Sequence, residues 1–173
     1  MDRSAIKAAL TRIHEGFIAR VLAVPMGERD VSRNGKWTPA QQIDHILRAV
    51  RPVAMAMRLP KWFLRWRFGK LNRPPRDYDA LVARYKEKLA AGGRASGRFV
   101  PPAIPAKQVE HIAKALETTV TALVRTVGRW SEQELDTVLL PHPLLGKLTV
   151  REMLFFTIYH VQHHHALVER DAA

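Results

Sequence analysis

The segment Phe155-Phe156-Thr157-Ile158-Tyr159-His160-Val161-Gln162-His163-His164-His165-Ala166-Leu167 carries four of the eight histidines of the chain within a helical apolar pattern. At about 100° per residue around a helix axis, His163 and His164 fall within about 60° of His160, on the side that also carries the apolar residues. His165 falls about 140° away. The segment therefore predicts an amphipathic helix whose inward side bears His160, His163 and His164.

Three further helical patterns precede this one, and each has apolar residues at steps of three and four. The four helices are expected from about Ser4 to Leu22, from Pro39 through Ala54, from about Ala106 to Val127 and from Thr149 to about Arg170. No period-two pattern predicts a strand. We therefore expect an all-α four-helix bundle in a single domain over residues 1–173. The long connection between the second and third core helices should add a short aromatic helix within Leu59–Pro75 and a charged helix over about Asp77–Ala91.

Composition narrows the chemistry. A chain of 173 residues with 47% hydrophobic content suits one substantial core. Because the chain has no cysteine, a disulfide framework, a thiolate zinc site and a cysteine nucleophile are excluded, and histidine is the remaining soft-metal ligand. The first residues lack the layout of a secretion signal, and no run reaches the roughly 18 apolar residues of a membrane span. A cytoplasmic protein is expected.

Histidines three or four residues apart on a helix converge, so His160 with His164 is the natural pair of metal ligands and His163 is the competitor of His164. A solvated run of histidines at a fraying helix end is the alternative interpretation. A third ligand would come from His45 or from one of three other histidines, which are His14, His111 and His142. His45 shares its side of the second helix with polar neighbours, a pattern that fits either the surface or a water-filled pocket.

Two blocks of the chain resemble the DinB-like, or YfiT-like, superfamily. The first is Trp37-Thr38-Pro39-Ala40-Gln41-Gln42-Ile43-Asp44-His45-Ile46, and the second is His142-Pro143-Leu144-Leu145-Gly146-Lys147-Leu148-Thr149, followed by His160 and His164. The resemblance implies a four-helix bundle, commonly homodimeric, in which His45, His160 and His164 hold a divalent metal such as nickel, zinc or iron. Leu167 stands where members of the superfamily often have Gln. This departure puts in doubt a contact of that side chain with the ligands or the substrate, but it leaves the set of three ligands unchanged.

Relatives in that superfamily include thiol S-transferases and proteins described as metal-dependent hydrolases. The resemblance therefore implies a metal-dependent enzyme that acts on a small molecule, such as a low-molecular-weight thiol. Four residues near the ligands in sequence are expected to line the substrate site, namely Trp37, Gln41, Arg48 and Tyr159. Arg48 could recognise a carboxylate of the substrate, or it could be an exposed or salt-bridged arginine.

The formal net charge of +12 is concentrated in residues 58–76, where cations alternate with aromatic residues and no acid occurs. The cations are Arg58, Lys61, Arg65, Arg67, Lys70, Arg73 and Arg76. This basic aromatic segment is compatible with an anionic membrane surface or with stacking on single-stranded nucleic acid. The simpler interpretation is that its aromatic residues cover the bundle end or a dimer interface while the cations are solvated.

Overall fold

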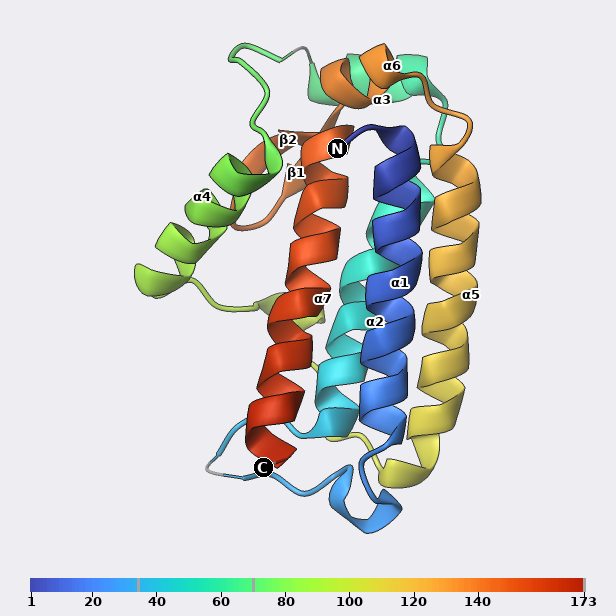
Figure 1. Cartoon of the computed structure of the whole chain (residues 1–173). Helices are drawn as coiled ribbons and strands as arrows, with labels where there is room; N and C mark the ends of the chain where they lie inside the picture. Colours follow the sequence, from blue (N-terminus) through green and yellow to red (C-terminus); the bar gives the residue numbers. More distant parts are fainter. Residues whose placement is uncertain (34, 70, 173) are drawn as a thin grey trace.

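The structure is a computed structural model that describes residues 1–33, 35–69 and 71–172, with only the backbone of Ala172. Lys70 of the basic aromatic segment and Ala173 of the expected domain lie outside the described residues. Four long helices pack side by side (Figure 1). They are α1 (Arg3–Leu22), α2 (Pro39–Ala56), α5 (Val109–Val127) and α7 (Val150–Ala172). Both α1 and α2 pack against α5 and α7, and the all-α prediction is confirmed.

Capping boxes begin the two helices that carry the candidate ligands. The Thr38 hydroxyl accepts a hydrogen bond from the backbone N–H of Gln41, whose side-chain oxygen accepts one from the backbone N–H of Thr38. Thr149 and Glu152 make the same reciprocal pair at the start of α7. Each pair satisfies two backbone donors that a helix leaves free, so local hydrogen bonds fix both starting points.

The connection between α2 and α5 holds the two extra helices that were expected, α3 (Lys61–Phe68) and α4 (Tyr78–Ala90). Figure 1 shows α3 beside the short α6 (Glu132–Thr137) across one end of the long helices, and α4 along the outer side of α7. Three short 3-10 turns complete the helical elements: η1 (Met26–Glu28), η2 (Gly97–Phe99) and η3 (Ala106–Gln108).

The expectation of no strands is wrong at one place. Strand β1 (Leu139–His142) pairs antiparallel with β2 (Gly146–Thr149) just before α7. Four residues are too few for an alternating pattern to stand out, and Leu139 and Leu140 are both buried, which removes the alternation altogether. Gly146, at φ 75°, adopts the left-handed conformation that the turn requires.

The core lies between the four long helices and is built from large aliphatic and aromatic side chains. Its fully buried members include Leu10 and Phe17 of α1, Ile43 and Ile46 of α2, Leu116 and Leu123 of α5, and Leu154 and Val161 of α7. Across the described part of the chain, no helix has both the length and the apolar character needed to cross a bilayer.

Candidate metal centre

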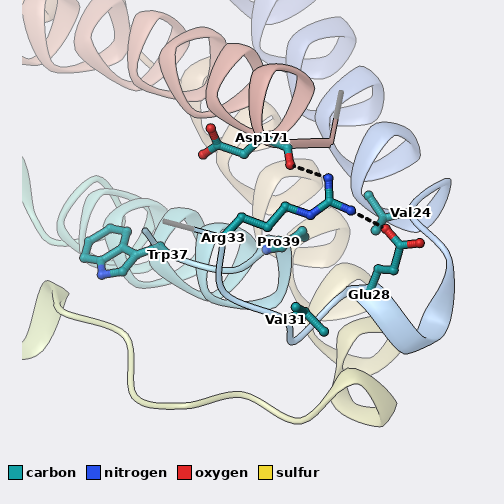
Figure 2. A pocket seen from close by; sticks show the side chains of 7 residues that line it. All are labelled: Val24, Glu28, Val31, Arg33, Trp37, Pro39 and Asp171. Carbon is teal, nitrogen blue, oxygen red and sulfur yellow. Dashed lines mark hydrogen bonds and ion pairs between the residues drawn. The ribbon is translucent and has the colours of Figure 1, made fainter. Parts of the chain in front are cut away.

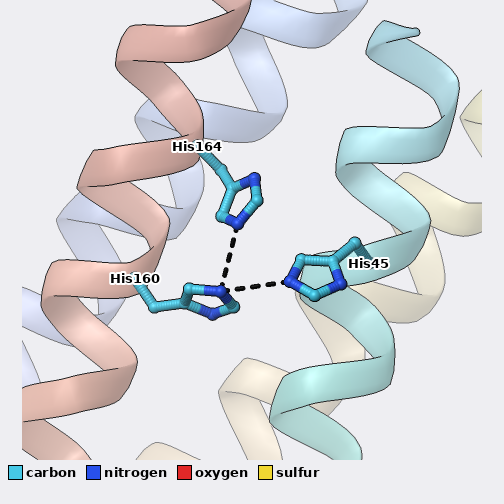
Figure 3. A group of neighbouring side chains, drawn as sticks. All are labelled: His45, His160 and His164. Carbon is cyan, nitrogen blue, oxygen red and sulfur yellow. Dashed lines mark hydrogen bonds between the residues drawn. The ribbon is translucent and has the colours of Figure 1, made fainter. Parts of the chain in front are cut away.

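Three histidines from two neighbouring helices meet inside the bundle. His45 projects from α2, and His160 and His164 project from adjacent turns of α7 toward it (Figure 3). The Nε2 atom of His160 lies 3.1 Å from Nε2 of His45 and 3.1 Å from Nε2 of His164. One ring nitrogen from each residue can be chosen so that all three lie within 4.8 Å of one another. All three side chains are buried.

Two of the rings are held in one tautomer by oxygen acceptors. Nδ1 of His45 lies 2.7 Å from the backbone carbonyl oxygen of Phe99, and Nδ1 of His164 lies 2.5 Å from the side-chain oxygen of Gln42. Because these oxygens accept and cannot donate, Nδ1 of each neutral ring carries the proton. The Nε2 atoms of His45 and His164 therefore present lone pairs to Nε2 of His160.

This arrangement fits a bound cation. Nε2 of His160 carries at most one proton, which can point at only one of the two facing lone pairs, so at least one of the two close nitrogen pairs has no proton between its atoms. Two ligands of a tetrahedral ion with metal–nitrogen distances of about 2.05 Å lie about 3.3 Å apart, close to the separations found here. A backbone carbonyl behind the ring, which Phe99 supplies for His45, is one of the usual partners of a metal-ligating histidine, and the Gln42 oxygen accepts the Nδ1 proton of His164 in the same way.

Burial keeps the three imidazoles neutral. Burial and the neighbouring rings hold the pKa of His160 and of His164 well below the ordinary 6.5. Burial also lowers the pKa of His45, with a smaller contribution from Arg48, while the Phe99 carbonyl and Asp44 oppose the shift. Only the neutral imidazole ring can bind a metal ion. The three histidines are therefore in the protonation state that metal binding requires at neutral pH.

A comparison with protein families agrees with this geometry. A family model described as the DinB superfamily matches residues 7–168, a range that contains all three histidines. The chain belongs to the DinB superfamily. No curated protein and no solved structure matches the chain. Membership and the three-histidine group together are compatible with metal binding.

In this DinB-superfamily chain an aromatic wall surrounds the histidines. The Trp37 ring lies 4.9 Å from that of His45, and Phe156 stacks on His160 with ring centres 4.8 Å apart. Tyr85 of α4 places its ring 6.2 Å from His160, and burial raises its pKa to about 12. The three histidines behind these rings are 5%, 6% and 5% exposed.

The four expected substrate residues fall in different places. Only Trp37 lies against the histidines. The Gln41 side chain caps α2 and donates to the carbonyl of Pro102. Arg48 pairs with Asp44 at 2.5 Å, so it is a salt-bridged arginine, although it keeps 35% of its side chain exposed. Tyr159 lies against Tyr85 and Lys86 of α4. A role for these residues in substrate binding stays a prediction.

The remaining histidines of α7 lie outside the cluster. His163 is half-buried, with its ring 6.4 Å from that of Tyr85. His165 lies 3.4 Å from Glu169 on another side of the helix. The geometric group contains His164 and leaves out His163, its competitor in the sequence.

The other candidates for the third ligand have separate surroundings. His14 is buried on α1, where Nδ1 bonds to the carbonyl of Leu10, and burial lowers its pKa to about 4. Nδ1 of His142 accepts from the backbone N–H groups of Leu144 and Leu145 and so fixes the hairpin turn. His111 is exposed on α5.

Sequence reasoning missed Gln42, Phe99 and Tyr85. Gln42 lies one helical turn before His45, so that spacing was a usable signal for a partner of the cluster. Phe99 contributes only its backbone carbonyl, which no side-chain pattern reveals. Tyr85 reaches the cluster from α4 and depends on how that helix packs on α7.

A separate cavity at the end of α7 is too small for a substrate. Arg33 crosses it, donating to Glu28 and to the carbonyl of Asp171, while the Trp37 ring points away (Figure 2). Its volume of about 20 Å³ is that of a single water site. The hydrogen bond from Arg33 to the Asp171 carbonyl ties the loop before α2 to the last turn of α7.

Proposed function

We propose that this protein binds one divalent transition metal through His45, His160 and His164 and is a metal-dependent enzyme of the thiol-transferase or hydrolase type. The observation that supports it is the convergence of three buried, neutral imidazoles, two of them anchored through Nδ1. An ion with three neutral protein ligands keeps its full charge and an open position, and it would act as a Lewis acid toward an oxygen or sulfur atom of the substrate.

The protein residues around the cluster would bind and orient the substrate. Trp37 and Phe156 offer apolar ring surface on two sides of the histidines. The high pKa of Tyr85 keeps its hydroxyl protonated at neutral pH, so it can donate a hydrogen bond.

Nickel, zinc and iron all suit imidazole ligands. The substrate would be a small molecule, with a low-molecular-weight thiol in the transferase case, and the protein would act as a homodimer.

The first test is metal analysis of untagged protein by mass spectrometry. The wild type should purify with close to one transition-metal ion per chain or take up one on titration. The variant His45→Ala, His160→Ala, His164→Ala should hold none, because all three nitrogen ligands are gone. His165→Ala is the matched control on α7 and should retain the metal. A wild type that binds no metal on titration would refute the proposal.

The second test concerns the anchor of His164. Gln42→Leu removes the acceptor of its Nδ1 proton and should weaken metal affinity about 10- to 100-fold, since that bond orients the ring and raises its basicity. Gln42→Glu keeps an acceptor and should restore most of the affinity. Gln108→Leu, at an exposed position before α5, is the control for loss of an amide. Equal affinities in Gln42→Leu and Gln108→Leu would show that the anchor does not act on the metal.

A further inference from the structure

No acidic residue occurs between Asp44 and Asp77. The structure uses some of the cations in this stretch internally. Lys61 pairs with Glu134 at 2.6 Å and lies over the Trp130 ring. Arg73 and Arg76 both bind Glu152. These three hold α3 and the segment after it onto the bundle, so they are not available to an outside partner.

Four other arginines of the stretch point to solvent. Arg51, Arg58, Arg65 and Arg67 are exposed, and within the described residues none of them makes an ion pair with a carboxylate. They lie on the last turns of α2, on the link to α3 and on α3 itself. A field of positive charge therefore covers this end of the molecule.

The outer side of α3 is aromatic. Trp62 and Trp66, one turn apart, are 70% and 75% exposed, and both rings contact Phe63 between them. On the opposite side Leu64 is fully buried. The simpler interpretation of the sequence expected the aromatic residues to cover the end of the bundle. The aliphatic Leu64 is buried there instead, and both indole rings remain exposed.

An open hollow of about 460 Å³ extends the apolar character toward α2. Its lining combines Met55, Leu59, Pro52 and Ala56 with the arginines Arg48, Arg51 and Arg98. Met55 and Leu59 are themselves 69% and 43% exposed. Leu59 lies two residues before the start of α3, so the hollow reaches the beginning of the aromatic helix.

We propose that this aromatic basic face docks on an anionic membrane surface. We define the face as Arg51, Met55, Arg58, Leu59, Trp62, Arg65, Trp66 and Arg67. Tryptophan prefers the interface between lipid headgroups and acyl chains, and arginine binds anionic headgroups. The aliphatic side chains of Met55 and Leu59 and the hollow between them suit the acyl and glycerol region of a lipid.

Other occupants fit the face less well. A second copy of the chain would bring four unpaired arginines against four others, a like-charge contact that opposes association. Single-stranded nucleic acid would use the cations and the indole rings, but it would leave the aliphatic residues of the hollow without a partner.

Co-sedimentation of the full chain with phosphatidylcholine vesicles, with and without phosphatidylglycerol, tests the proposal. The protein should bind the anionic vesicles with a blue shift of tryptophan emission and should leave the neutral ones. Binding should weaken as salt rises from about 0.1 M to about 1 M, where the Debye length falls from about 10 Å to about 3 Å.

Two variants and a matched control separate the contributions. Removing three surface charges with Arg58→Gln, Arg65→Gln, Arg67→Gln should weaken binding about a hundredfold. Trp62→Ser, Trp66→Ser should weaken it at least about tenfold and abolish the blue shift. The control Arg12→Gln, Lys107→Gln, Arg125→Gln removes the same charge from exposed positions on and beside α1 and α5, and it should retain most of the binding.

Three results would overturn the inference. The first is failure to bind anionic vesicles, and the second is equal binding to neutral ones. The third is a protein that does not bind vesicles but is retained on single-stranded DNA, or that forms a dimer in the wild type and a monomer in the tryptophan variant. Because the ligand histidines are untouched, metal content of the variants should equal that of the wild type, which separates this test from that of the metal centre.

Discussion

Removing the metal with a chelator is expected to lower the free energy of unfolding by about 4 kcal/mol, if the free ion was present at about a thousand times its dissociation constant. His45 and His160 lie 115 residues apart in the sequence and meet only in the folded chain. The ion would therefore bind the native state much more tightly than the unfolded state. For a chain of this length, about 4 kcal/mol corresponds to a decrease of roughly 10 °C in the thermal midpoint. Differential scanning calorimetry with and without EDTA measures it.

The same experiment decides which histidine of α7 completes the site. His164→Ala should lose the difference between metal-loaded and chelated protein, because one of three ligands is gone. His163→Ala, one residue away and outside the cluster, should keep it. The opposite pattern would assign the ligand to His163, and a wild type that chelation leaves unchanged would contradict the metal proposal itself.

The helices were predictable because their signals are local. Thr38-Pro39, and Thr149 with Glu152, mark helix starts within four residues of chain, and the structure shows a capping box at each. The hairpin before α7 was missed because it depends on pairing across a turn and on burial of both leucines at the start of β1.

The candidate site shows the same limit at larger scale. The helical periodicity was compatible with His45 on the surface or in a pocket. The family resemblance was needed to select His45 as the third ligand. His45 is buried because η2 covers it, with the Phe99 carbonyl on Nδ1, and because Trp37 lies on its ring. Both contacts depend on how loops cross the bundle, which helical spacing does not encode.

Gln41 and Gln42 illustrate the difference within two residues. The side chain of Gln41 closes the capping box of α2 and donates to the backbone carbonyl of Pro102. Its neighbour points inward and holds His164 across the bundle. Sequence proximity to His45 selected the first glutamine, whereas the contact belongs to the second.

Replacing Glu152 with glutamine should destabilise the fold by about 3 kcal/mol. Its carboxylate is fully buried and accepts two hydrogen bonds from Arg73 at 2.7 Å, with others from the backbone N–H groups of Arg76 and Thr149. The neutral amide would leave the Arg73 charge without its counterion and place an N–H group among donors. The value lies at the low end for a broken buried pair because Arg73 keeps 25% of its side chain in solvent.

Chemical denaturation of Glu152→Gln against the wild type measures the loss. Glu117→Gln is the matched control, because Glu117 pairs with Lys114 on the exposed side of α5 and such pairs contribute little. A loss in Glu152→Gln no larger than in this control would show that the buried pair is not important for stability.

Acid provides a second readout of the same carboxylate. Burial raises the pKa of Glu152, but the hydrogen bonds from Arg73, Arg76 and Thr149 outweigh burial and bring the pKa below 4.5. Because the folded pKa lies below the unfolded one, the ionised carboxylate stabilises the fold fully above pH 4.5, and this contribution is lost as the pH falls through the folded pKa. The stability difference between wild type and Glu152→Gln should therefore be constant above pH 4.5 and shrink below it.

Since Glu152 fixes the first turn of α7, a shift of that turn would be transmitted along the helix to His160, so the variant should also bind metal more weakly than the Glu117→Gln control.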